Sequence, residues 1–252
     1  MKKRRDVRRF GSGPYLLGLT GGEGDPDDHV GFPYEALADV QQLSFDQPVT
    51  LLAGDNGTGK STIIEACAAA MGFAEEGGEL ERLGELPAVP RSIYKGFLTP
   101  VVNRWARPRI GYFLRAESFF NVALGADEAT DFTNYGDRPL HQQSHGQSFL
   151  ALASNRFGGE GIFILDEPEA ALSVTGALAL VAVIARAAEQ GAQFIIATHS
   201  PILLAVPGAK IYELTEDGFA DTEYDDLDAV RLMRGFLDAP GRYLRAALGT
   251  DD

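Results

Sequence analysis

Short apolar runs alternate with longer helical stretches along most of this chain. The apolar runs at 49–53, 109–115, 162–165 and 194–197 have the length and composition of buried strands. Stretches of helical character cover about 60–71, 149–155 and 174–190, and Gly191 stands where a C-cap glycine belongs. This alternation predicts an α/β fold with a mainly parallel central sheet flanked by helices.

The segments outside this alternation are richer in glycine, proline and acidic residues. We expect a basic tail or edge strand at 1–10, a loop at 11–31, two strands within 39–53, an insertion at 73–108, a hairpin joining 210–213 to 219–224, and a helical segment at 226–248 that breaks near Pro240. The insertion is expected either to cover the site as a lid or to pack on the first helix. Because the motifs of one site span the chain, we expect a single domain over 1–252, in which 1–31 is a basic tail and loop.

Residues 54–62 read Gly-Asp-Asn-Gly-Thr-Gly-Lys-Ser-Thr, directly after a predicted strand and before a predicted helix. This is the phosphate-binding pattern G-x-x-x-x-G-K-[ST] in its strand–loop–helix setting. Its glycines let backbone N–H groups surround a phosphate, and the helix dipole favours the same anion. We expect Lys60 to contact the β/γ-phosphates and the Ser61 hydroxyl to bind Mg²⁺. The predicted nucleotide-binding residues are Asp55, Asn56, Gly57, Thr58, Gly59, Lys60, Ser61 and Thr62.

Two later strands end in residues that suit nucleotide hydrolysis. The run at 162–165 is followed by Asp166 and Glu167, and ligands of open α/β sheets bind at the carboxyl ends of strands. We expect Asp166 to hold Mg²⁺ and Glu167 to orient and polarise the attacking water. The next strand leads to His199, and the helix between the two strands predicts that they are parallel neighbours. His199 could then reach a γ-phosphate by a hydrogen bond.

The segment Gln143-Ser144-His145-Gly146-Gln147-Ser148 precedes the helical stretch at 149–155. A serine and a glycine that open a helix form either an ordinary cap or an anion site, because free N–H groups and the helix dipole point there. Taken alone, these residues favour the cap.

In this order, the four segments resemble the motifs of the ABC-type ATPases. Residues 54–62 match Walker A, residues 162–167 match Walker B with its catalytic glutamate, and Ser144, Gly146 and Gln147 match the signature motif Leu-Ser-Gly-Gly-Gln. His199 matches the switch histidine, residues 170–173 lie where the D-loop falls, and residues 110–117 lead into the position of the Q-loop. The resemblance covers about residues 38–214. It implies the P-loop fold of these ATPases, with an antiparallel β subdomain and a short helical region that carries the signature.

Within that superfamily the chain is similar to a group of bacterial ATPases that are often labelled AAA-family proteins. The matching phrases lie at 113–120, 144–150, 165–173, 195–204 and 242–245. The resemblance implies ATP and Mg²⁺ as cofactors and an ATP-dependent homodimer, in which two copies meet head to tail around two ATP molecules. Each Walker A site is then completed by Ser144, Gly146 and Gln147 of the other copy.

The chain departs from the family pattern at three places. The signature has Gln143 and His145 where leucine and glycine are usual, and His145 either touches the nucleotide or only alters the loop. The Q-loop has no clear glutamine. Glu117 is our candidate for its metal-contacting residue, and Arg115 is the alternative. Arg115 could equally form a plain salt bridge with no role at the site. No aromatic residue can be assigned to adenine stacking, because Phe32 and Tyr34 fit core or hairpin packing better.

Composition and charge bear on which partners the protein can bind and on where in the cell it acts. A net charge of −14 argues against a broad basic surface for nucleic acid. Residues 1–9 nevertheless carry six basic residues against Asp6, and this end either contacts DNA, RNA or anionic lipid or is a solvated terminus. The single cysteine, Cys67, excludes an internal disulfide framework and is expected to be a small core residue. No apolar run approaches the roughly 20 residues that span a bilayer, and no signal-peptide core follows the basic start, so we predict a cytoplasmic protein.

The spacing of the motifs bears on what the ATPase cycle drives. Between Lys60 and Ser144 there is no room for the long coiled coil of SMC-like proteins. Between Glu117 and Ser144 a transporter-sized helical subdomain also looks too large. Three outputs stay open: action on nucleic acid in DNA repair or defence, an ATP-dependent dimerisation switch that regulates a protein partner, and, less favoured, the motor subunit of a transporter.

Overall fold

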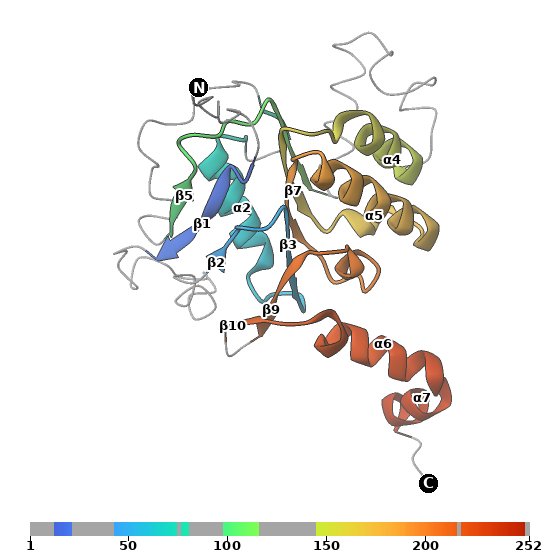
Figure 1. Cartoon of the computed structure of the whole chain (residues 1–252). Helices are drawn as coiled ribbons and strands as arrows, with labels where there is room; N and C mark the ends of the chain where they lie inside the picture. The colour runs from blue at the N-terminus through green and yellow to red at the C-terminus, as the bar shows by residue number, and fades with distance from the viewer. Residues whose placement is uncertain are drawn as a thin grey trace, which may run out of the picture.

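Two β-sheets pack on either side of one helix, α2 (Lys60–Met71), in the computed structural model of the protein (Figure 1). The structure describes residues 13–21, 43–74, 77–80, 98–115, 145–215 and 218–249. The arrangement of these segments explains how residues far apart in the sequence come to share one site.

The larger sheet has seven strands in the order β10-β9-β3-β8-β7-β6-β4. Their bounds are β3 Val49–Gly54, β4 Gly78–Glu79, β6 Ile110–Arg115, β7 Gly161–Asp166, β8 Gln193–Ala197, β9 Lys210–Thr215 and β10 Gly218–Asp221. The five inner strands run parallel, while the edge strands β10 and β4 run antiparallel to their neighbours. The predicted α/β fold with a mainly parallel sheet is confirmed, and so is the predicted hairpin, which is formed by β9 and β10.

The smaller sheet is antiparallel, in the order β2-β1-β5, with bounds β1 Leu16–Gly21, β2 Leu43–Ser44 and β5 Leu98–Val102. Strand β1 shows that the prediction of a loop throughout 11–31 was wrong. Leu16 and Leu19 are buried in the same core as α2, whereas Leu17, which lies at the irregularity in the pairing between Leu16 and Gly18, is exposed. This apolar run is short, and the glycines and prolines around it have the composition of a loop.

The described part of the insertion at 73–108 packs on the first helix, which is one of the two expectations for it. Phe73, Leu80 and Ala106 are buried in the core that contains α2, and β5 contributes a strand to the smaller sheet. The stretches 75–76 and 81–97 lie outside the described residues.

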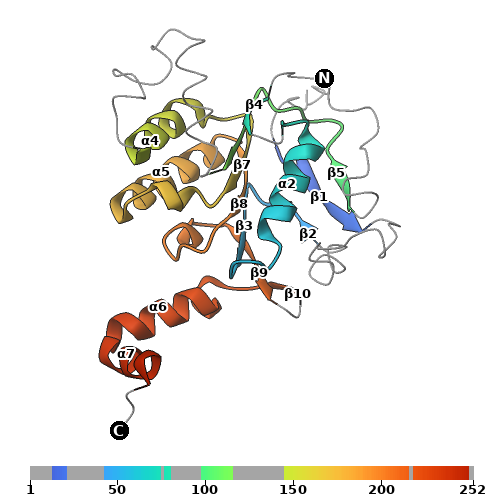
Figure 2. The ribbon, with the colours of Figure 1, turned by 180° about the vertical axis from the view of Figure 1, so that it is seen from behind.

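Two hydrophobic layers cover the two faces of the larger sheet (Figures 1 and 2). Helices α4 (His145–Arg156) and α5 (Val174–Glu189) lie on one face, and α2 lies on the other. Because successive side chains of a strand point to opposite faces, Phe163 and Leu165 of β7 join the layer of α4 and α5, while Ile162 and Ile164 join the layer of α2. Burial on both faces is the normal state of a parallel sheet.

Cys67 lies in α2 and is fully buried, which confirms the prediction of a small core residue. Ser173 caps the N-terminus of α5, and its hydroxyl accepts a hydrogen bond from the Gly176 N–H at 3.1 Å. The helix ends just before Gly191, which has a φ of +99°. That glycine turns the chain back toward β8.

Two helices at the C-terminal end, α6 (Asp228–Asp238) and α7 (Pro240–Leu248), extend away from the sheets in both views (Figures 1 and 2). They confirm the predicted helical segment and its break near Pro240. Leu227 and Val230 join the core, but six large apolar side chains of the pair are exposed: Leu232, Met233, Phe236, Leu237, Leu244 and Leu248. In the part of the chain that the structure describes, no helix combines the length and apolar character needed to cross a membrane.

The buried side chain of Gln193 connects the two sheets. At the start of β8, its Oε1 accepts hydrogen bonds from the N–H groups of Tyr15 (2.7 Å) and Leu16 (3.0 Å). Its Nε2 donates to the carbonyl oxygens of Leu16 (2.7 Å) and Phe45 (3.3 Å). One amide side chain therefore satisfies four backbone groups of the smaller sheet and of the chain next to it, at a place where water has little access.

We expect Gln193→Ala to lower the free energy of unfolding by about 2–4 kcal/mol, because it leaves several buried backbone groups without partners. Urea denaturation followed by circular dichroism measures this loss. Gln190→Ala, at the exposed end of α5, is the matched control and should change stability by less than about 0.5 kcal/mol. Equal stability of the two variants would show that Gln193 does not hold the sheets together.

Candidate functional site

The carboxyl ends of β3, β8 and β7 lie side by side at one edge of the larger sheet. In the parallel register Leu52 of β3 pairs with Ala197 of β8, and Ala197 pairs with Asp166 of β7. The chain leaves these strands as the glycine-rich loop, the loop with His199 and the turn with Glu167. The prediction that the strands before Glu167 and His199 are parallel neighbours is confirmed.

The glycine-rich loop makes a tight turn from β3 into α2. Gly54, Gly57 and Gly59 have φ angles of +137°, +86° and +95°, which residues with a side chain rarely adopt. At Gly54 a Cβ atom would also lie 2.4 Å from the carbonyl oxygen of Leu214 in β9. The predicted binding residues Asp55, Asn56, Gly57, Thr58, Gly59, Lys60, Ser61 and Thr62 form this turn and the first turn of α2. The backbone is thus shaped for close approach by a ligand.

The Lys60 side chain is buried and folds back over this loop. Its Nζ donates to the carbonyl oxygens of Gly54 at 2.8 Å and Asp55 at 2.7 Å. Burial lowers the pKa of Lys60, while the carboxylates of Glu167 and Asp166 act in the opposite direction. The cation is therefore held at the N-terminal end of α2, where the helix dipole also favours an anion.

Ser61 and Asp166 meet across the gap between α2 and β7. The Ser61 hydroxyl donates to Asp166 Oδ1 at 3.2 Å. Burial raises the pKa of Asp166 to about 6, although the charge of Arg115 and the hydrogen bond from Ser61 oppose this rise. A hydroxyl and a carboxylate are hard oxygen ligands, and Mg²⁺ in nucleotide sites commonly takes one or two carboxylates together with substrate phosphates. This pair therefore fits a magnesium ion that arrives with a nucleotide.

Arg115 stands at the end of β6, next to Asp166. Its Nη2 contacts Glu65 Oε1 of α2 at 2.6 Å, and its Nε lies 3.8 Å from Asp166 Oδ2. The salt bridge that was one interpretation of Arg115 is therefore present. The additional contact with Asp166 was not predicted, since the register of β6 against β7 cannot be derived from the local sequence.

Glu167 follows β7 in the left-handed conformation, with φ 47° and ψ 51°, which costs a residue with a side chain about 1–2 kcal/mol. Its N–H donates to the Ala197 carbonyl oxygen at 2.9 Å, so the turn is tied to β8. The imidazole of His199 is half-exposed, and its Nδ1 lies 3.6 Å from Glu167 Oε1. Both predicted catalytic side chains thus lie together at the same sheet edge as Asp166.

Glu169 is a residue of this site that the sequence analysis missed. It lies in the 3₁₀ helix η6 (Pro168–Ala171), and its Oε1 accepts hydrogen bonds from Thr198 Oγ1 (2.5 Å), His199 N (2.9 Å) and Ser200 N (3.1 Å). The His199 Nδ1 atom is 3.5 Å from the same oxygen. The only available signal was a second acidic residue two positions after Glu167, and such acids are common on solvated turns.

The signature segment lies elsewhere. Helix α4 begins at His145 and lies on the face of the sheet opposite to α2 (Figures 1 and 2). Gly146 packs closely on η6, because a Cβ atom there would lie 2.7 Å from the Ala171 carbonyl oxygen. The structure therefore brings Lys60, Ser61, Asp166, Glu167 and His199 together, and Gly146 lies beside η6 at the start of α4.

Several predicted residues lie outside the described part of the chain. They are Ser144 of the signature, Glu117 of the Q-loop, Phe32, Tyr34 and the basic residues of 1–9. Within the described ranges, no group of three or more His, Cys, Asp and Glu side chains could bind a metal by itself.

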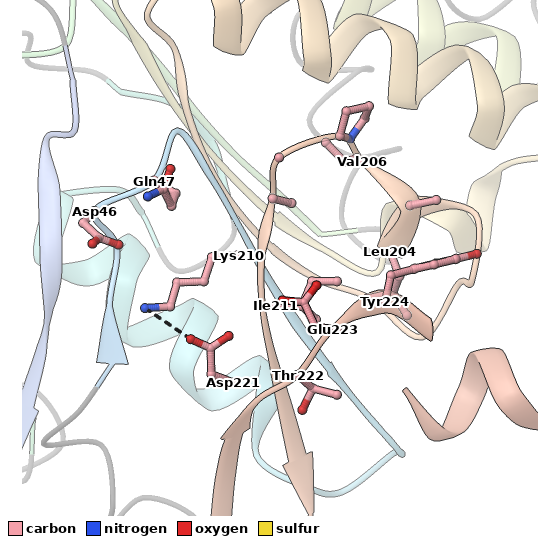
Figure 3. Close-up of a pocket in the computed structure, with 14 residues that line it drawn as sticks. Asp46, Gln47, Leu204, Val206, Lys210, Ile211, Asp221, Thr222, Glu223 and Tyr224 are labelled. Atoms are coloured by element: carbon pink, nitrogen blue, oxygen red, sulfur yellow. Dashed lines mark ion pairs between the residues drawn. The ribbon is translucent and has the colours of Figure 1, made fainter. Parts of the chain in front are cut away.

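A cavity of about 650 Å³ lies at the opposite end of the sheet, where β3 and β9 begin (Figure 3). Lys210 projects into it and its Nζ lies 3.7 Å from Asp221 Oδ2, while Asp46 and Glu223 add further negative charge. Since the loops that follow β3, β7 and β8 are at the other edge, this cavity takes no part in the site described above.

Two family models match separate parts of the chain. The first, described as an AAA domain, matches residues 33–84, which include the glycine-rich loop. The second, whose description reads AAA domain and refers to the AbiEii toxin of a type IV TA system, matches residues 114–205, which include Asp166, Glu167 and His199.

Known proteins resemble the chain over much of its length. The cytochrome c biogenesis ATP-binding export protein CcmA of Gluconobacter oxydans (strain 621H) is 31% identical over 156 residues, which cover 61% of this chain and 69% of that protein. CcmA of Salmonella typhi is 31% identical over 180 residues, which cover 66% of this chain and 83% of that protein.

Among solved structures, cbiO1 from Clostridium perfringens, part of the ABC transporter complex cbiONQ, has a TM-score of 0.52. It covers 90% of this chain and 96% of that chain at 16% identity, so this likeness concerns the fold. The sequence identity to CcmA, sustained over most of its length, assigns the family: the chain belongs to the ABC-type ATPase superfamily and is an ATP hydrolase.

Proposed function

We propose that the chain binds and hydrolyses Mg-ATP at the edge formed by β3, β7 and β8. The observation that carries this proposal is the contact of the Ser61 hydroxyl with Asp166 Oδ1, directly beside the buried Lys60. In this proposal Lys60 leaves the carbonyl oxygens of its own loop to contact the β/γ-phosphates, and the loop N–H groups surround the phosphate oxygens. Ser61 and Asp166 would hold Mg²⁺, which would supply positive charge to neutralise the phosphates.

The hydrolytic step in this proposal uses Glu167 and His199. Glu167 accepts a hydrogen bond from the attacking water and directs its oxygen at the γ-phosphorus. His199 donates to a γ-phosphate oxygen, where negative charge is concentrated during the transfer. The distance of 3.6 Å between the two side chains supports action on the same phosphate. Glu117 is proposed as a further contact to the metal on the family pattern alone.

We further propose that ATP joins two copies head to tail. Support comes from the place of α4, which carries Gly146 and Gln147 and lies on the sheet face opposite to α2, and from the resemblance to the signature motif. The loop Ser144–Gln147 of one copy would then complete the Walker A site of the other. Loss of the γ-phosphate releases these contacts and opens the dimer, an order–disorder switch of the kind used by nucleotide-driven proteins.

What this cycle drives is a separate proposal. The CcmA relatives are named ATP-binding export proteins, which favours the motor of a membrane exporter, although the motif spacing counts against it. A DNA-repair or defence role has the AbiEii description in its favour, whereas the net charge of −14 opposes extensive contact with nucleic acid. We favour a cycle that acts on a protein partner in the cytoplasm or at a membrane, with action on DNA as the alternative.

We expect Glu167→Gln to reduce ATP turnover by about 10²–10⁴-fold, since the amide cannot act as a base for water. ATP binding should persist and trap the closed dimer, which light scattering with size-exclusion chromatography detects at saturating ATP and Mg²⁺. Glu189→Gln on the exposed end of α5 is the control and should turn over normally. A variant that stays monomeric under these conditions would refute the head-to-tail dimer.

We expect Asp166→Asn to abolish Mg²⁺-dependent stabilisation of the nucleotide complex. Wild-type protein with ATP should gain several degrees in Tm on addition of Mg²⁺, and excess EDTA should reverse the gain, because ligands that bind only the folded state stabilise it. The variant should gain little from Mg²⁺. An equal Mg²⁺ response in both proteins would remove Asp166 from the metal site.

We expect linear double-stranded DNA to change steady-state ATP turnover by less than about twofold at low salt, because the chain is strongly acidic. The assay repeats the measurement at rising salt, with Glu167→Gln as the blank. Severalfold stimulation that disappears at higher salt would instead favour a DNA-clamping ATPase.

Cofractionation of the tagged protein with membranes in cell lysates tests the exporter proposal independently.

A further inference from the structure

One carboxylate oxygen, Glu169 Oε1, organises the loop that carries His199. Three consecutive residues of this loop, Thr198, His199 and Ser200, donate hydrogen bonds to it, one through a hydroxyl and two through backbone N–H groups. The Thr198 hydroxyl also accepts a hydrogen bond from Ser200 N at 3.0 Å, so the loop is cross-linked internally around the same point. Such an arrangement closes the loop around the carboxylate and gives its backbone one shape.

The burial of Glu169 makes these contacts strong. The side chain is 10% exposed, Thr198 is fully buried, and Oε2 of Glu169 is buried without a hydrogen-bond partner among the described residues. Hydrogen bonds to an ionised acceptor are stronger than neutral ones, and a low local dielectric strengthens them further. Because Oε2 finds no partner there, the three hydrogen bonds to Oε1 are what offset the burial of this carboxylate.

Glu169 also connects the two segments that bear the hydrolytic residues. It lies two positions after Glu167, in the same 3₁₀ helix whose first turn is closed by the hydrogen bond from Ala170 N to Glu167 O at 3.1 Å. Its carboxylate reaches across to the loop after β8. A movement of η6 relative to β8 would therefore move His199 as well as Glu167. On its far side, η6 receives the close packing of Gly146 against Ala171.

From these contacts we infer that Glu169 is a positioning residue that holds the His199 loop in register with Glu167. This inference rests on the proposed hydrolytic function of that site. Glu169 touches neither nucleotide nor water in this role; it acts through the His199 backbone. Because Gly146 packs against Ala171 of η6, Glu169 also connects the His199 loop to the start of α4. In the proposed dimer, the start of α4 is the segment that contacts the second copy.

We call the hydrogen bonds from Thr198, His199 and Ser200 to Glu169 Oε1 the clamp. The clamp is tested by hydrogen–deuterium exchange of the nucleotide-free protein, with mass spectrometry of a peptide that covers 198–204. The amides of His199 and Ser200 should exchange about ten- to a hundredfold faster in Glu169→Ala than in wild type, because they lose a charged acceptor. Glu189→Ala should leave this peptide unchanged. Unaltered exchange in Glu169→Ala would overturn the clamp, whatever the ATPase activity is.

The positioning role is tested by a double-mutant cycle on steady-state ATP hydrolysis. Glu169→Ala should lower kcat by about 10- to 100-fold with KM for ATP nearly unchanged, as observed for residues that orient a primary group. In the His199→Ala background the same change should cost less than about twofold, because Glu169 then has no histidine to position. Equal losses in both backgrounds would overturn the inference.

Two further measurements separate a failure of the Glu169 inference from a failure of the variant to fold and from a failure of the proposed function. Glu169→Gln preserves the size of the side chain and one acceptor oxygen, so it should fall between wild type and Glu169→Ala in both assays, and it replaces Glu169→Ala in the cycle if the alanine variant does not fold. A wild-type protein without ATP turnover would refute the proposed function, while the exchange experiment would still decide whether Glu169 holds the loop.

Discussion

The parallel pairing of β3, β8 and β7 is the constraint on which the site depends. Three segments of the chain, one of them more than a hundred residues before the other two, end at one level of the sheet, because Leu52, Ala197 and Asp166 share one register. A one-residue slip in either ladder would turn Asp166 or His199 to another face. Burial on both faces by α2 on one side and by α4 and α5 on the other makes such a slip costly, since every strand side chain would then change layers.

The charged side chains at this edge have partners within the protein in the absence of a nucleotide. The Lys60 ammonium rests on two carbonyl oxygens, Asp166 is paired with the Ser61 hydroxyl and lies near Arg115, and Glu169 is surrounded by donors. Each buried charge thus has a local partner, which lowers the cost of burying it. Binding of an anion such as ATP then exchanges partners around existing charges, and little reorganisation is needed.

Sequence reasoning succeeded where chemistry is local and failed where it depends on distant pairing. The Walker A segment could be predicted because its glycines, lysine and serine act within one turn and the first turn of a helix. Strand β1 was missed because its burial depends on α2 and β5, which come later in the chain. Glu169 and Gln193 look like ordinary surface residues in the sequence, and their roles arise from partners about 30 and 177 positions away. The left-handed turn at Glu167 likewise had no sequence signal.

The position of β3 in the sheet has a consequence for synthesis. Its neighbours are β8 and β9, so the strand that leads into the phosphate loop gains its two sheet partners only after residue 215 has been made. Pairing between such distant segments is slow, because loop closure is paid before the contacts form. The ribosome therefore carries the early part of the chain, with its apolar strand exposed, for on the order of ten seconds or more at ordinary elongation rates. The phosphate loop is thus made early in synthesis, but the strand that leads into it is paired on both sides only after β9 has been made.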